Sequence, residues 1–426
     1  MHKSIVSIAK GSDAEKLVHK ALLLLGGVEN LIRPNSSVVV KPNAGHWFPP
    51  ETSVCTSPAV VSAVIKEIRK AKPREIILAE SSAIGADTMK CFEISGIGKA
   101  AEEAGIDKII DIKSDKDLIK IPIRDARSEL KKILLPRFIV EADHIVNVPI
   151  FKPNMCTIFT SALKNLKGLV QDKVHHEMHA TSLNDAMLDL CSVAKVDLHI
   201  VDMIRPAEGF GPHCTLPIDF GCIVAGKDPV AVDATICRMV GIDVDTIQYL
   251  AEARERGLGN CDKQSIEIRG NSIKEVFKEL WIPSLGGFEK YPEYHIYKEN
   301  SCSSCQSLMA FTMEKLKAVD EYDRNAGISI VFGPKKSLPG GVKPGKDLIL
   351  VGDCVKKYRE QGIWIAGCPP IEPFPVYAII DRVPMVTAEQ GAALRPRNDG
   401  DMDKLNRYMY REKEKRTKGL KKKKAK

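Results

Sequence analysis

The stretches "SVVVKPN" at residues 37–43 and "EIILAES" at residues 75–81 decide the fold of the larger part of this chain. Each is a short apolar run that ends in polar residues, and a helical stretch from Ser57 to Ala71 lies between them. The Ser-Pro opening of that stretch is typical of a helix N-terminus with proline in its first turn. A strand, a helix and a second strand in this order predict a β–α–β unit with parallel strands.

The same pattern continues to about residue 280, through "HIVNVPIFK", "LHIVDMI" and "GCIVAGKDP". Apolar strands that alternate with helices predict an α/β fold, with a mostly parallel sheet covered by helices on both faces. Ligands of such sheets bind beyond the carboxyl ends of the strands, so we expect residues 1–280 to form an α/β domain with a polar, cationic cleft there. The residues predicted at these five strand ends are Lys41 with Asn43, Glu80 with Ser81, Lys152 with Asn154, Asp202 with Arg205, and Asp228.

Lysine is concentrated in the segment that follows the third of these strands. Lys164 and Lys167 are three residues apart, which places them on one face of a helix. Asn165 lies beside them in an otherwise apolar stretch, where a polar side chain needs a reason. Together with Lys41 and Lys152, these lysines predict a binding site for a carboxylate or a phosphate. Solvated helix lysines are the alternative.

The segment "VHHEMH" at residues 174–179 resembles a zinc-protease motif but lacks its spacing. That motif needs His-Glu, two further residues and a second His, and His176-Glu177-Met178-His179 is one residue short. His175 and His179 are four residues apart and are candidates for binding a metal or a substrate; plain surface histidines are equally compatible with the sequence.

Two aspartates and one loop complete the candidate residues of this domain. Asp228 precedes Pro229 at a predicted helix start, where an N-cap explains it. Asp233 falls inside that helix among alanines and valines, so we expect it to face polar partners in the cleft. The glycine-rich loop "RPAEGFGPH" at residues 205–213 is a weak indication of a nearby ligand.

Residues 281–385 predict a second, smaller α/β domain that carries four cysteines: Cys302, Cys305, Cys354 and Cys368. The first two form a C-x-x-C pair, and each of the others follows an apolar strand and enters a loop bounded by glycine or proline. This arrangement can bring four thiolates to one edge of the domain, as zinc and iron–sulfur centres require.

The spacing of these cysteines favours a [4Fe–4S] cluster. A proline follows Cys368 directly, as in ferredoxin-type runs. Structural zinc sites of this kind usually have two C-x-x-C pairs, and here there is one, so zinc is the alternative. A redox dithiol would explain Cys302 and Cys305 but leave the other two unused. A bound cluster can also serve only to hold a small domain together.

Composition and charge describe an ordinary globular chain of 426 residues with a net charge of +8. Residues 403–426 carry twelve Lys or Arg against three acidic residues, a net of +9, so the rest is near −1. We expect residues 386–426 to be an extended, disordered basic tail, for which nucleic acid or anionic lipid is a less favoured partner. No signal peptide and no membrane span are expected, which predicts a cytoplasmic protein with reduced thiols.

As a set, several stretches resemble the iron–sulfur-associated family called domain of unknown function 362, which is common in anaerobic bacteria and archaea. The matching stretches include "VVVKPN", "DHIVNVPIFKPN", "FTSALKNLKGLV" and "GCIVAGKDPVAVDA", in family order between about residues 36 and 240, and the cysteines resemble a domain that accompanies some members. The resemblance implies an α/β domain coupled to a [4Fe–4S] centre. Where many members have Thr-His, this chain has Pro153 and Asn154, so His175 or His179 would have to take over a histidine role. The positions to which the family pattern points are Lys41, Asn43, Lys152, Lys164, Asn165, Asp202, Asp228 and Asp233.

Two functions from different classes fit these residues. The favoured one is an iron–sulfur enzyme of anaerobic metabolism, an oxidoreductase or lyase that acts on an anionic small molecule bound between the strand ends and the cluster. The alternative is a non-catalytic electron carrier or cluster-handling protein with a redox partner protein, or a structural zinc module on an anion-binding domain. For the enzyme, the expected catalytic residues are Lys152, Lys164, Asp202 and Asp233, and the expected substrate-binding residues are Lys41, Asn43, Glu80, Asn165, Lys167, His175 and His179.

Overall fold

The two stretches at residues 37–43 and 75–81 form neighbouring parallel strands, β2 (Ser37–Pro42) and β3 (Glu75–Glu80), connected through helix α3 (Pro58–Lys70). The predicted β–α–β unit is therefore confirmed. Helix α3 begins at Pro58, but the side chain of Ser57 makes no capping hydrogen bond. The backbone N–H of Ser57 donates instead to the carboxylate of Asp202, at 2.9 Å.

The structure is a computed structural model and describes residues 3–283, 287–370 and 374–424. The chain divides into two units, Met1–Ile282 and Pro283–Lys426. Strands β2 and β3 belong to an eight-stranded sheet in the first unit. The mainly parallel α/β fold expected from the sequence is confirmed. In order across the sheet the strands are β14 (Ile266–Gly270), β1 (Ser4–Lys10), β13 (Cys222–Gly226), β10 (Leu198–Met203), β7 (His144–Val148), β2, β3 and β4 (Lys108–Asp111).

Strand β13 runs against the other strands of this sheet, because it pairs antiparallel with both β1 and β10. Its carboxyl end therefore lies at the opposite edge from the ends of β2, β3, β7 and β10. Asp228 follows β13 and caps helix α10 (Pro229–Val240), as expected. Its carboxylate accepts from the Ser4 hydroxyl at 2.6 Å and the Asn260 N–H at 2.8 Å. The prediction that Asp228 shares an edge with the other four strand ends was wrong.

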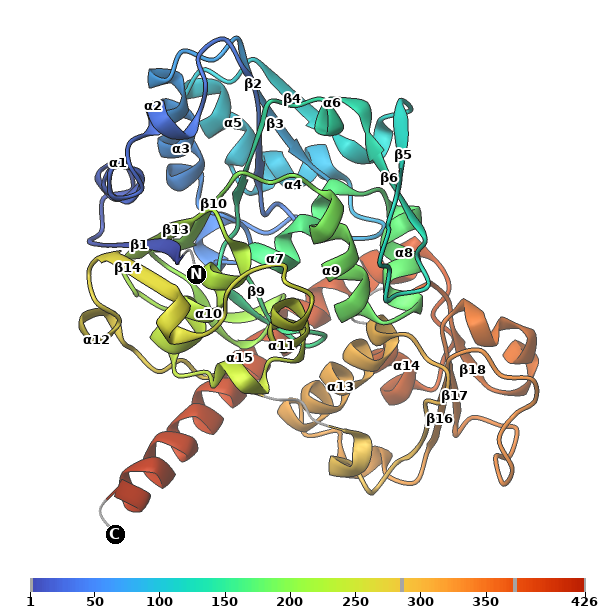
Figure 1. Ribbon diagram of the computed structural model, residues 1–426. Coiled ribbons are helices and arrows are strands. Elements are labelled where there is room, and N and C mark those ends of the chain that lie inside the picture. Colours follow the sequence, from blue (N-terminus) through green and yellow to red (C-terminus); the bar gives the residue numbers. More distant parts are fainter. Residues whose placement is uncertain (1–2, 284–286, 371–373, 425–426) are drawn as a thin grey trace. The chain divides into compact units, whose positions relative to one another are not determined.

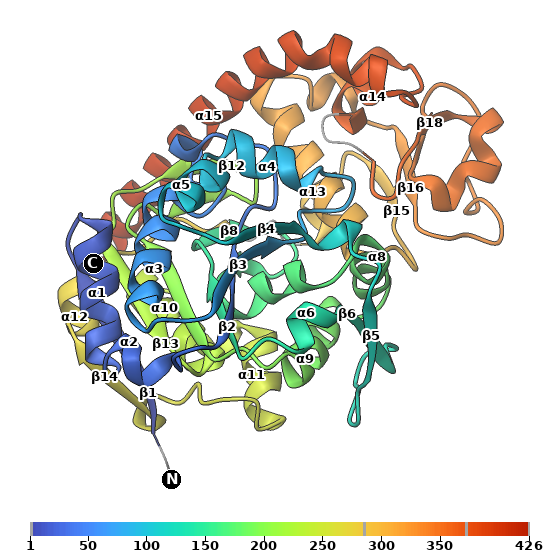
Figure 2. The same ribbon diagram turned by 90° about the horizontal axis from the view of Figure 1, so that it is seen from above.

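Helices cover both faces of the sheet, and each face has its own apolar core (Figures 1 and 2). Alternate residues of β2 show the division, since Val38 and Val40 enter one core and Val39 enters the other. The helices beside the first core are α1 (Ala14–Leu24), α2 (Val28–Leu31), α3, α4 (Thr88–Ile94) and α5 (Ile97–Glu103). The second core includes α7 (Ala162–Asn165), the 3-10 helix η3 (Leu166–Leu169), α8 (Asp172–Ala180), α9 (Leu183–Val193), α10 and α11 (Gln248–Glu255).

Smaller elements complete this unit. They are the hairpins β5 (Leu118–Pro122) with β6 (Lys132–Pro136), β8 (Lys152–Asn154) with β9 (Ile158–Thr160), and β11 (Ala207–Phe210) with β12 (Cys214–Pro217), and the one-turn helices α6 (Arg137–Val140) and α12 (Ile273–Val276).

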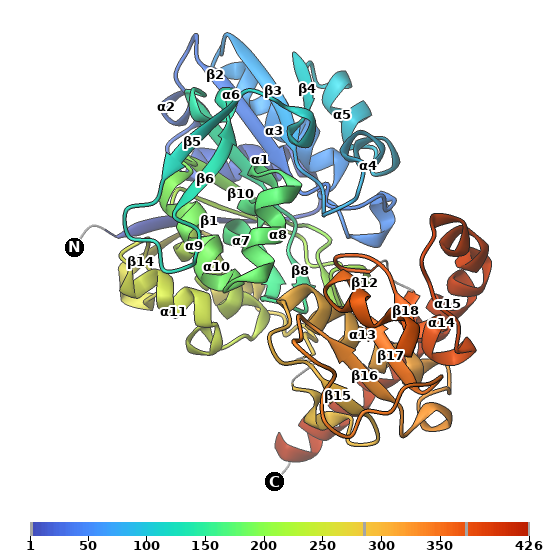
Figure 3. The same cartoon turned by 90° about the vertical axis from the view of Figure 1, so that its right-hand side faces the viewer.

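The second unit has a four-stranded parallel sheet with helices packed on it (Figure 3). The strand order follows the chain, and all neighbouring strands are parallel, so every carboxyl end lies at one edge of this sheet. Its elements are β15 (His295–Tyr297), α13 (Ser303–Ala318), β16 (Ser329–Phe332), β17 (Leu348–Val351), the 3-10 helix η8 (Asp353–Gln361), β18 (Ile363–Ile365), α14 (Phe374–Asp381) and α15 (Ala388–Lys424).

Helix α15 corrects the expectation of an extended tail at residues 386–426. Leu405 and Met409 of this helix are fully buried, and the Tyr408 hydroxyl donates to Glu314 of α13 at 3.0 Å. Apolar residues at 405 and 409 share a helical face, and that short pattern is hidden in the sequence among many lysines. In the part of the chain that the structure describes, no helix combines the length and apolar composition of a membrane span.

Candidate functional site

Four lysines gather at the carboxyl ends of β2, β3 and β7 in the first unit, and we call Lys41, Lys152, Lys164 and Lys167 the lysine cluster. Lys41 ends β2 and Lys152 begins β8, just after β7, whereas Lys164 lies on α7 and Lys167 on η3. The structure thus brings together the lysines that the sequence singled out. They are deeply placed, since Lys41 is 0% and Lys152 is 3% exposed, while Lys164 and Lys167 are half-buried.

Lys41 is neutralised by a buried partner, Glu80 at the end of β3. The Lys41 Nζ donates to Glu80 Oε2 at 2.9 Å and to the Pro42 carbonyl at 2.9 Å. The other carboxylate oxygen accepts from the Ser81 N–H at 2.9 Å. Burial lowers the pKa of Lys41 and raises the pKa of Glu80, and the ion pair opposes both shifts. Lys41 and Glu80 therefore form an ion pair within the cluster, and each neutralises the charge of the other.

Lys152 and Lys164 have no such partner among the described residues. Lys152 donates to Asn43 Oδ1 at 3.0 Å and to the Val54 carbonyl, which are both uncharged acceptors. Burial lowers the pKa of Lys152 to about 8, and repulsion from Lys164 and Lys41 contributes. Burial also lowers the pKa of Lys164, for which no described carboxylate lies within ion-pair distance. An ammonium group that is removed from water and has no counter-charge is costly, so a buried and a half-buried lysine without carboxylate partners together indicate a place for an anion.

Lys167 is held by both candidate histidines of α8. Its Nζ donates to His179 Nε2 at 2.7 Å, and its carbonyl lies 2.6 Å from His175 Nε2. Burial lowers the pKa of Lys167 to about 7 and the pKa values of both histidines well below the usual range, with repulsion from Lys167 adding to the histidine shifts. Neutral imidazoles therefore face a lysine whose proton is readily exchanged near neutral pH.

A network of amides fixes the geometry around the lysines. Asn43 Nδ2 donates to Asn165 Oδ1 at 2.8 Å. Asn165 Nδ2 in turn donates to Asn147 Oδ1 at 2.8 Å, and Asn147 Nδ2 donates to the Ala162 carbonyl at 2.9 Å. The three asparagines lie directly after β2, on β7 and on α7, so they connect the end of the strand that carries Lys41 with the helix that carries Lys164. Lys152 joins this network through its hydrogen bond to Asn43. The sequence had pointed to Asn43 and Asn165 but not to Asn147.

The two aspartates expected to act as acid or base instead bind backbone N–H groups. Asp202 accepts from Ser57 and Ile204. Asp233 accepts from Ala162 at 2.8 Å and Leu163 at 3.1 Å, which places it at the start of α7. Burial raises the pKa of both, that of Asp233 to about 7. Their contacts position helices α3 and α7, so neither is placed by a described contact against a lysine of the cluster.

Two further histidines join the cluster, and reasoning from the sequence missed them. The rings of His46 and His213 are nearly perpendicular, with centroids 3.8 Å apart. Burial, with repulsion from Lys152 and Lys164, lowers the pKa of His213 to about 3 and that of His46 well below its usual range. His213 lies in the turn between β11 and β12, so the segment 205–213, expected to be a glycine-rich loop, contains strand β11 instead. A Cβ at Gly211 would lie 2.0 Å from the Pro153 carbonyl oxygen, so glycine allows this turn to approach β8.

In the second unit, the four cysteines gather at the carboxyl edge of the parallel sheet. Gly352 N–H donates to the Ile365 carbonyl, and Asp353 and Gly367 exchange hydrogen bonds, which holds the loops of Cys354 and Cys368 together. A Cβ at Gly352 would lie 3.6 Å from the Cys354 sulfur and 3.7 Å from the Cys305 sulfur.

The four thiols also affect one another's protonation. The hydrogen bond from Cys305 lowers the pKa of Cys302 to about 6, whereas that bond, burial and the charges of the other three cysteines raise the pKa of Cys305. Burial and a neighbouring Cys302 thiolate raise the pKa values of Cys354 and Cys368. Within the described ranges, no three His, Cys, Asp or Glu side chains have the geometry of a formed metal site. The donor set is nevertheless the thiolate set that iron–sulfur clusters use.

Comparisons with known proteins give relatives that match a little more than half of the chain. A curated relative, the thylakoid-associated protein sll1697 of Synechocystis sp., is 27% identical over 248 residues, which is 55% of this chain and 72% of the relative. Among solved structures, the lactate racemase apoprotein of Thermoanaerobacterium thermosaccharolyticum matches with a TM-score of 0.38 and 14% identity, over 56% of this chain and 57% of that one. A protein from Thermotoga maritima matches with a TM-score of 0.35 and 15% identity, over 58% and 59%.

One family model matches the chain, and its limits coincide with the part that holds the lysine cluster. It is described as domain of unknown function (DUF362) and matches residues 38–238. That range begins inside β2 and ends inside α10, so it includes all four lysines, both pairs of histidines and the three asparagines. The segment 38–238 is therefore a DUF362 match, and the candidate site lies wholly within it.

Proposed function

We propose that the protein is an iron–sulfur-cluster-binding enzyme that acts on an anionic small molecule bound at the lysine cluster. The anion site is supported most directly by one observation: Lys152 is buried, the neighbouring Lys164 is half-buried, and neither has a described carboxylate partner. A carboxylate or phosphate ester at this place would supply the missing negative charge. Their predicted role is to bind and neutralise this group, with Lys41, Asn43, Glu80 and Asn165 supporting them.

Lys167 and His179 are suited to exchange a proton with the bound molecule. The pKa of about 7 for Lys167 lies near the value at which a general acid or base is most effective. His175 holds the backbone of Lys167 and thereby positions it. We propose that Asp202 and Asp233 contribute by positioning α3 and α7 rather than by transferring protons. The binding screen described next identifies the class of anion that the site takes.

The anion site is tested by replacing Lys152 and Lys164 together with Met and screening carboxylates and phosphate esters by thermal shift and calorimetry. We expect wild-type protein to bind at least one of them and the variant to bind it about tenfold more weakly or worse, since a charged hydrogen bond contributes about 1.5–3 kcal/mol. The matched control removes two exposed lysines, Lys66 and Lys108, which pair with Glu15 and Glu75. Unchanged binding of every anion in the Lys152/Lys164 variant would contradict the proposal.

For the second unit we propose a [4Fe–4S] cluster on Cys302, Cys305, Cys354 and Cys368, with zinc as the alternative. When bound, such a cluster supplies one-electron transfer. Anaerobic purification followed by iron, sulfide and zinc analysis should give about four irons and four sulfides per chain. Cys368→Ser should lose them, and Cys191→Ser, a cysteine of the first unit, should retain them. One zinc without iron would establish the alternative, and no metal in either protein would contradict both.

The exposure of Cys354 and Cys368 favours a second candidate function, that of an electron carrier. A cluster held by exposed ligands can exchange electrons with a partner protein, and four cysteine ligands leave no iron open to a substrate. This function predicts that cluster reduction and reoxidation persist in the Lys152/Lys164 variant and that no anion binds to the wild-type protein.

A further inference from the structure

The four-stranded sheet of the second unit is covered by different kinds of segment on its two faces. Helices α13 and α14 pack on one face. The other face is covered by the connection between β16 and β17, through Leu338 and Val342, and by η8, through Val355. The two connections at residues 333–347 and 352–362 therefore form a layer of their own, and most of their residues are exposed.

This layer is positively charged, whereas the rest of the unit up to residue 402 is negatively charged. Residues 333–347 and 352–362 contain seven Lys or Arg and three Asp or Glu, a net of +4. The other residues between 283 and 402 contain eight Lys or Arg and twelve Asp or Glu, a net of −4. Charge that is separated in this way creates a field that attracts an acidic partner and orients it.

Five exposed lysines carry the excess charge of the layer, and none of them pairs with a carboxylate among the described residues. We call these lysines the basic face: Lys336, Lys343, Lys346, Lys356 and Lys357. Most other charges of the layer are neutralised in pairs: Lys335 with Glu299 at 2.9 Å, Asp347 with Arg382 at 3.3 Å, and Arg359 with Glu360 at 3.0 Å. The carboxylate of Asp353 remains, so the five lysines outnumber the free acidic groups.

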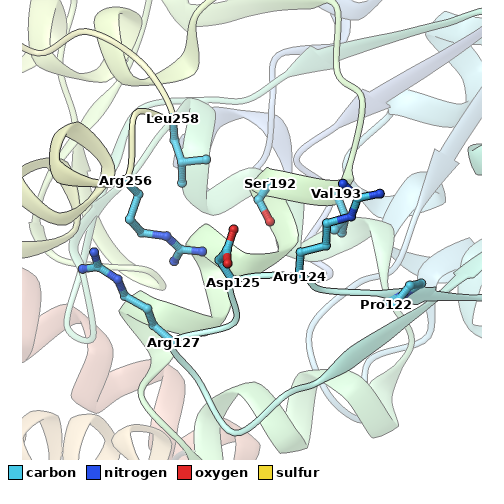
Figure 4. A pocket seen from close by; sticks show the side chains of 8 residues that line it. All are labelled: Pro122, Arg124, Asp125, Arg127, Ser192, Val193, Arg256 and Leu258. Atoms are coloured by element: carbon cyan, nitrogen blue, oxygen red, sulfur yellow. The ribbon is translucent and has the colours of Figure 1, made fainter.

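A hollow of about 450 Å³ in the first unit shows the opposite situation (Figure 4). Its lining includes Arg124, Arg127 and Arg256, but each positive charge is balanced. Asp125 lies among the arginines, Glu255 pairs with Arg127 at 3.7 Å, and Asp189 pairs with Arg256 at 2.6 Å. The hollow has no excess charge to offer a partner, whereas the basic face has.

The lysines nearest the cysteines are held in place before any partner arrives. Lys357 Nζ donates to the Lys336 carbonyl at 3.2 Å, and Lys356 Nζ lies 5.6 Å from the centre of the Trp364 ring. The indole N–H of Trp364 in turn donates to the carbonyl of Gly352 at 3.1 Å, two residues before Cys354. Ordered lysines reduce the entropy cost of binding, and these contacts place them around the loop that carries an exposed cysteine.

We propose that the basic face docks a small electron-carrier protein through an acidic surface of that protein. Encounters between redox proteins use small interfaces, and complementary charge gives them rapid association and the correct orientation. The face presents its charge directly beside Cys354, an exposed cysteine of the proposed cluster site. The proposal rests on the cluster proposed for the second unit, because the exchange of a single electron with the carrier requires a close approach to it.

The test uses the anaerobically purified full-length protein and, as the probe, a small ferredoxin with a strongly acidic surface. A carbodiimide couples lysine side chains directly to carboxylates, and mass spectrometry then locates the contact. We expect cross-links at Lys336, Lys356 and Lys357. Replacing these three lysines with Gln should weaken binding at low ionic strength about tenfold by calorimetry, because three exposed charge pairs together correspond to a change of about that size. All three are exposed, so the variant should fold normally.

Two control variants remove positive charge elsewhere. One replaces Lys16, Lys66 and Lys108, exposed lysines of the first unit, with Gln. The other replaces the four lysines at residues 421–424, because the basic end of α15 is the competing surface. Both should bind the ferredoxin as wild type does. The proposal is overturned if the Lys336/Lys356/Lys357 variant also does so, if only the α15 variant loses binding, or if duplex DNA displaces the ferredoxin from the face.

Iron analysis of the same samples separates this proposal from the proposed cluster. An iron-loaded protein that does not bind the ferredoxin overturns the docking surface and leaves the cluster in place. A protein without iron that binds the ferredoxin through these lysines contradicts the cluster and leaves the docking surface in place.

Discussion

Lys41 shows how one buried charge can be accommodated in an apolar sheet. It is 0% exposed, and its partner Glu80 is 2% exposed. A Cβ at Gly168 would lie 1.7 Å from Glu80 Oε1 and 2.6 Å from Lys41 Nζ. Because residue 168 is glycine, η3 can close directly over the ion pair. The pair is therefore enclosed on every side by protein, and removal of one partner leaves the other without water or counter-charge.

Replacing Lys41 with Met should lower the free energy of unfolding by about 3–5 kcal/mol, because it leaves Glu80 buried and unpaired. Urea denaturation at pH 7 measures this. In the double variant Lys41→Met, Glu80→Leu much of the loss should be recovered, since no charge is then buried alone. A double variant as unstable as the sum of the two single variants would show that the two side chains do not act as a pair.

Asp233 should give the folded protein a distinct pH dependence. Burial raises its pKa to about 7 from an ordinary value of 3.8, so between these values the folded state keeps a proton that the unfolded chain has released. The free energy of unfolding should therefore decrease by up to a few kcal/mol as the pH rises from about 4 to about 7. Asp233→Asn removes this titration. Urea denaturation across the pH range should show wild type losing stability relative to the variant, and a constant difference would contradict the shift.

Single residues of the candidate site could be predicted to different extents. Lys41, Lys152 and Asn43 were recognisable because a polar residue that ends an apolar strand has a known position at the sheet edge. His46 and His213 were not recognisable, because their contact joins two loops that are distant in the sequence. Asp233 was placed correctly inside a helix, but its backbone partners depend on how α10 packs on α7.

At the scale of elements, the apolar pattern predicted which segments form strands but not their directions. "GCIVAGKDP" has the same composition whether its strand runs parallel or antiparallel, and the reversal of β13 moved Asp228 to the other edge. In the same way, the lysine-rich composition of residues 403–426 concealed the buried Leu405 and Met409 of α15. The spacing of the C-x-x-C pair, by contrast, indicates that the two cysteines are close together, and in the structure Cys302 is the N-cap of α13 and Cys305 lies in its first turn.

The loop between β5 and β6 is an element that depends on one buried carboxylate. Asp189→Ala removes four hydrogen bonds and leaves the Arg256 charge buried without a partner. We expect a loss of about 3–5 kcal/mol in the free energy of unfolding, together with rapid tryptic cleavage after Arg124 and Arg127. Asp125→Ala, which changes an exposed carboxylate of the same loop, is the control and should do neither. Equal resistance of both variants to trypsin would contradict the anchoring role of Asp189.

At the scale of the whole molecule, the fold class was predictable because β-branched runs and helical stretches alternate over most of the first unit. The pairing of strands that are distant in the sequence could not be predicted from composition. Strand β1 lies between β13 and β14, its partners from the far end of the unit. The family match at residues 38–238 contains β13 but neither β1 nor β14.

A fragment limited to residues 38–238 should therefore be poorly folded, since it leaves the β13 edge without its partner β1. We expect that fragment to aggregate. A fragment of residues 1–282 should unfold in one cooperative thermal transition and give the circular-dichroism signal of a folded α/β domain. Circular dichroism and light scattering of both fragments measure this. A soluble, cooperative 38–238 fragment would show that the flanking strands are dispensable.

The position of β1 also has a consequence for synthesis on the ribosome. Once β1 has left the exit tunnel, residues 222–226 and then 266–270 must be translated before either of its neighbours exists. During that interval the nascent chain carries an apolar segment, "SIVSIAK", with both edges open. A chaperone that recognises extended apolar peptides can bind the segment during that interval. Slow codons after residue 270 would give the first unit time to complete its sheet before the cysteine-bearing unit is translated.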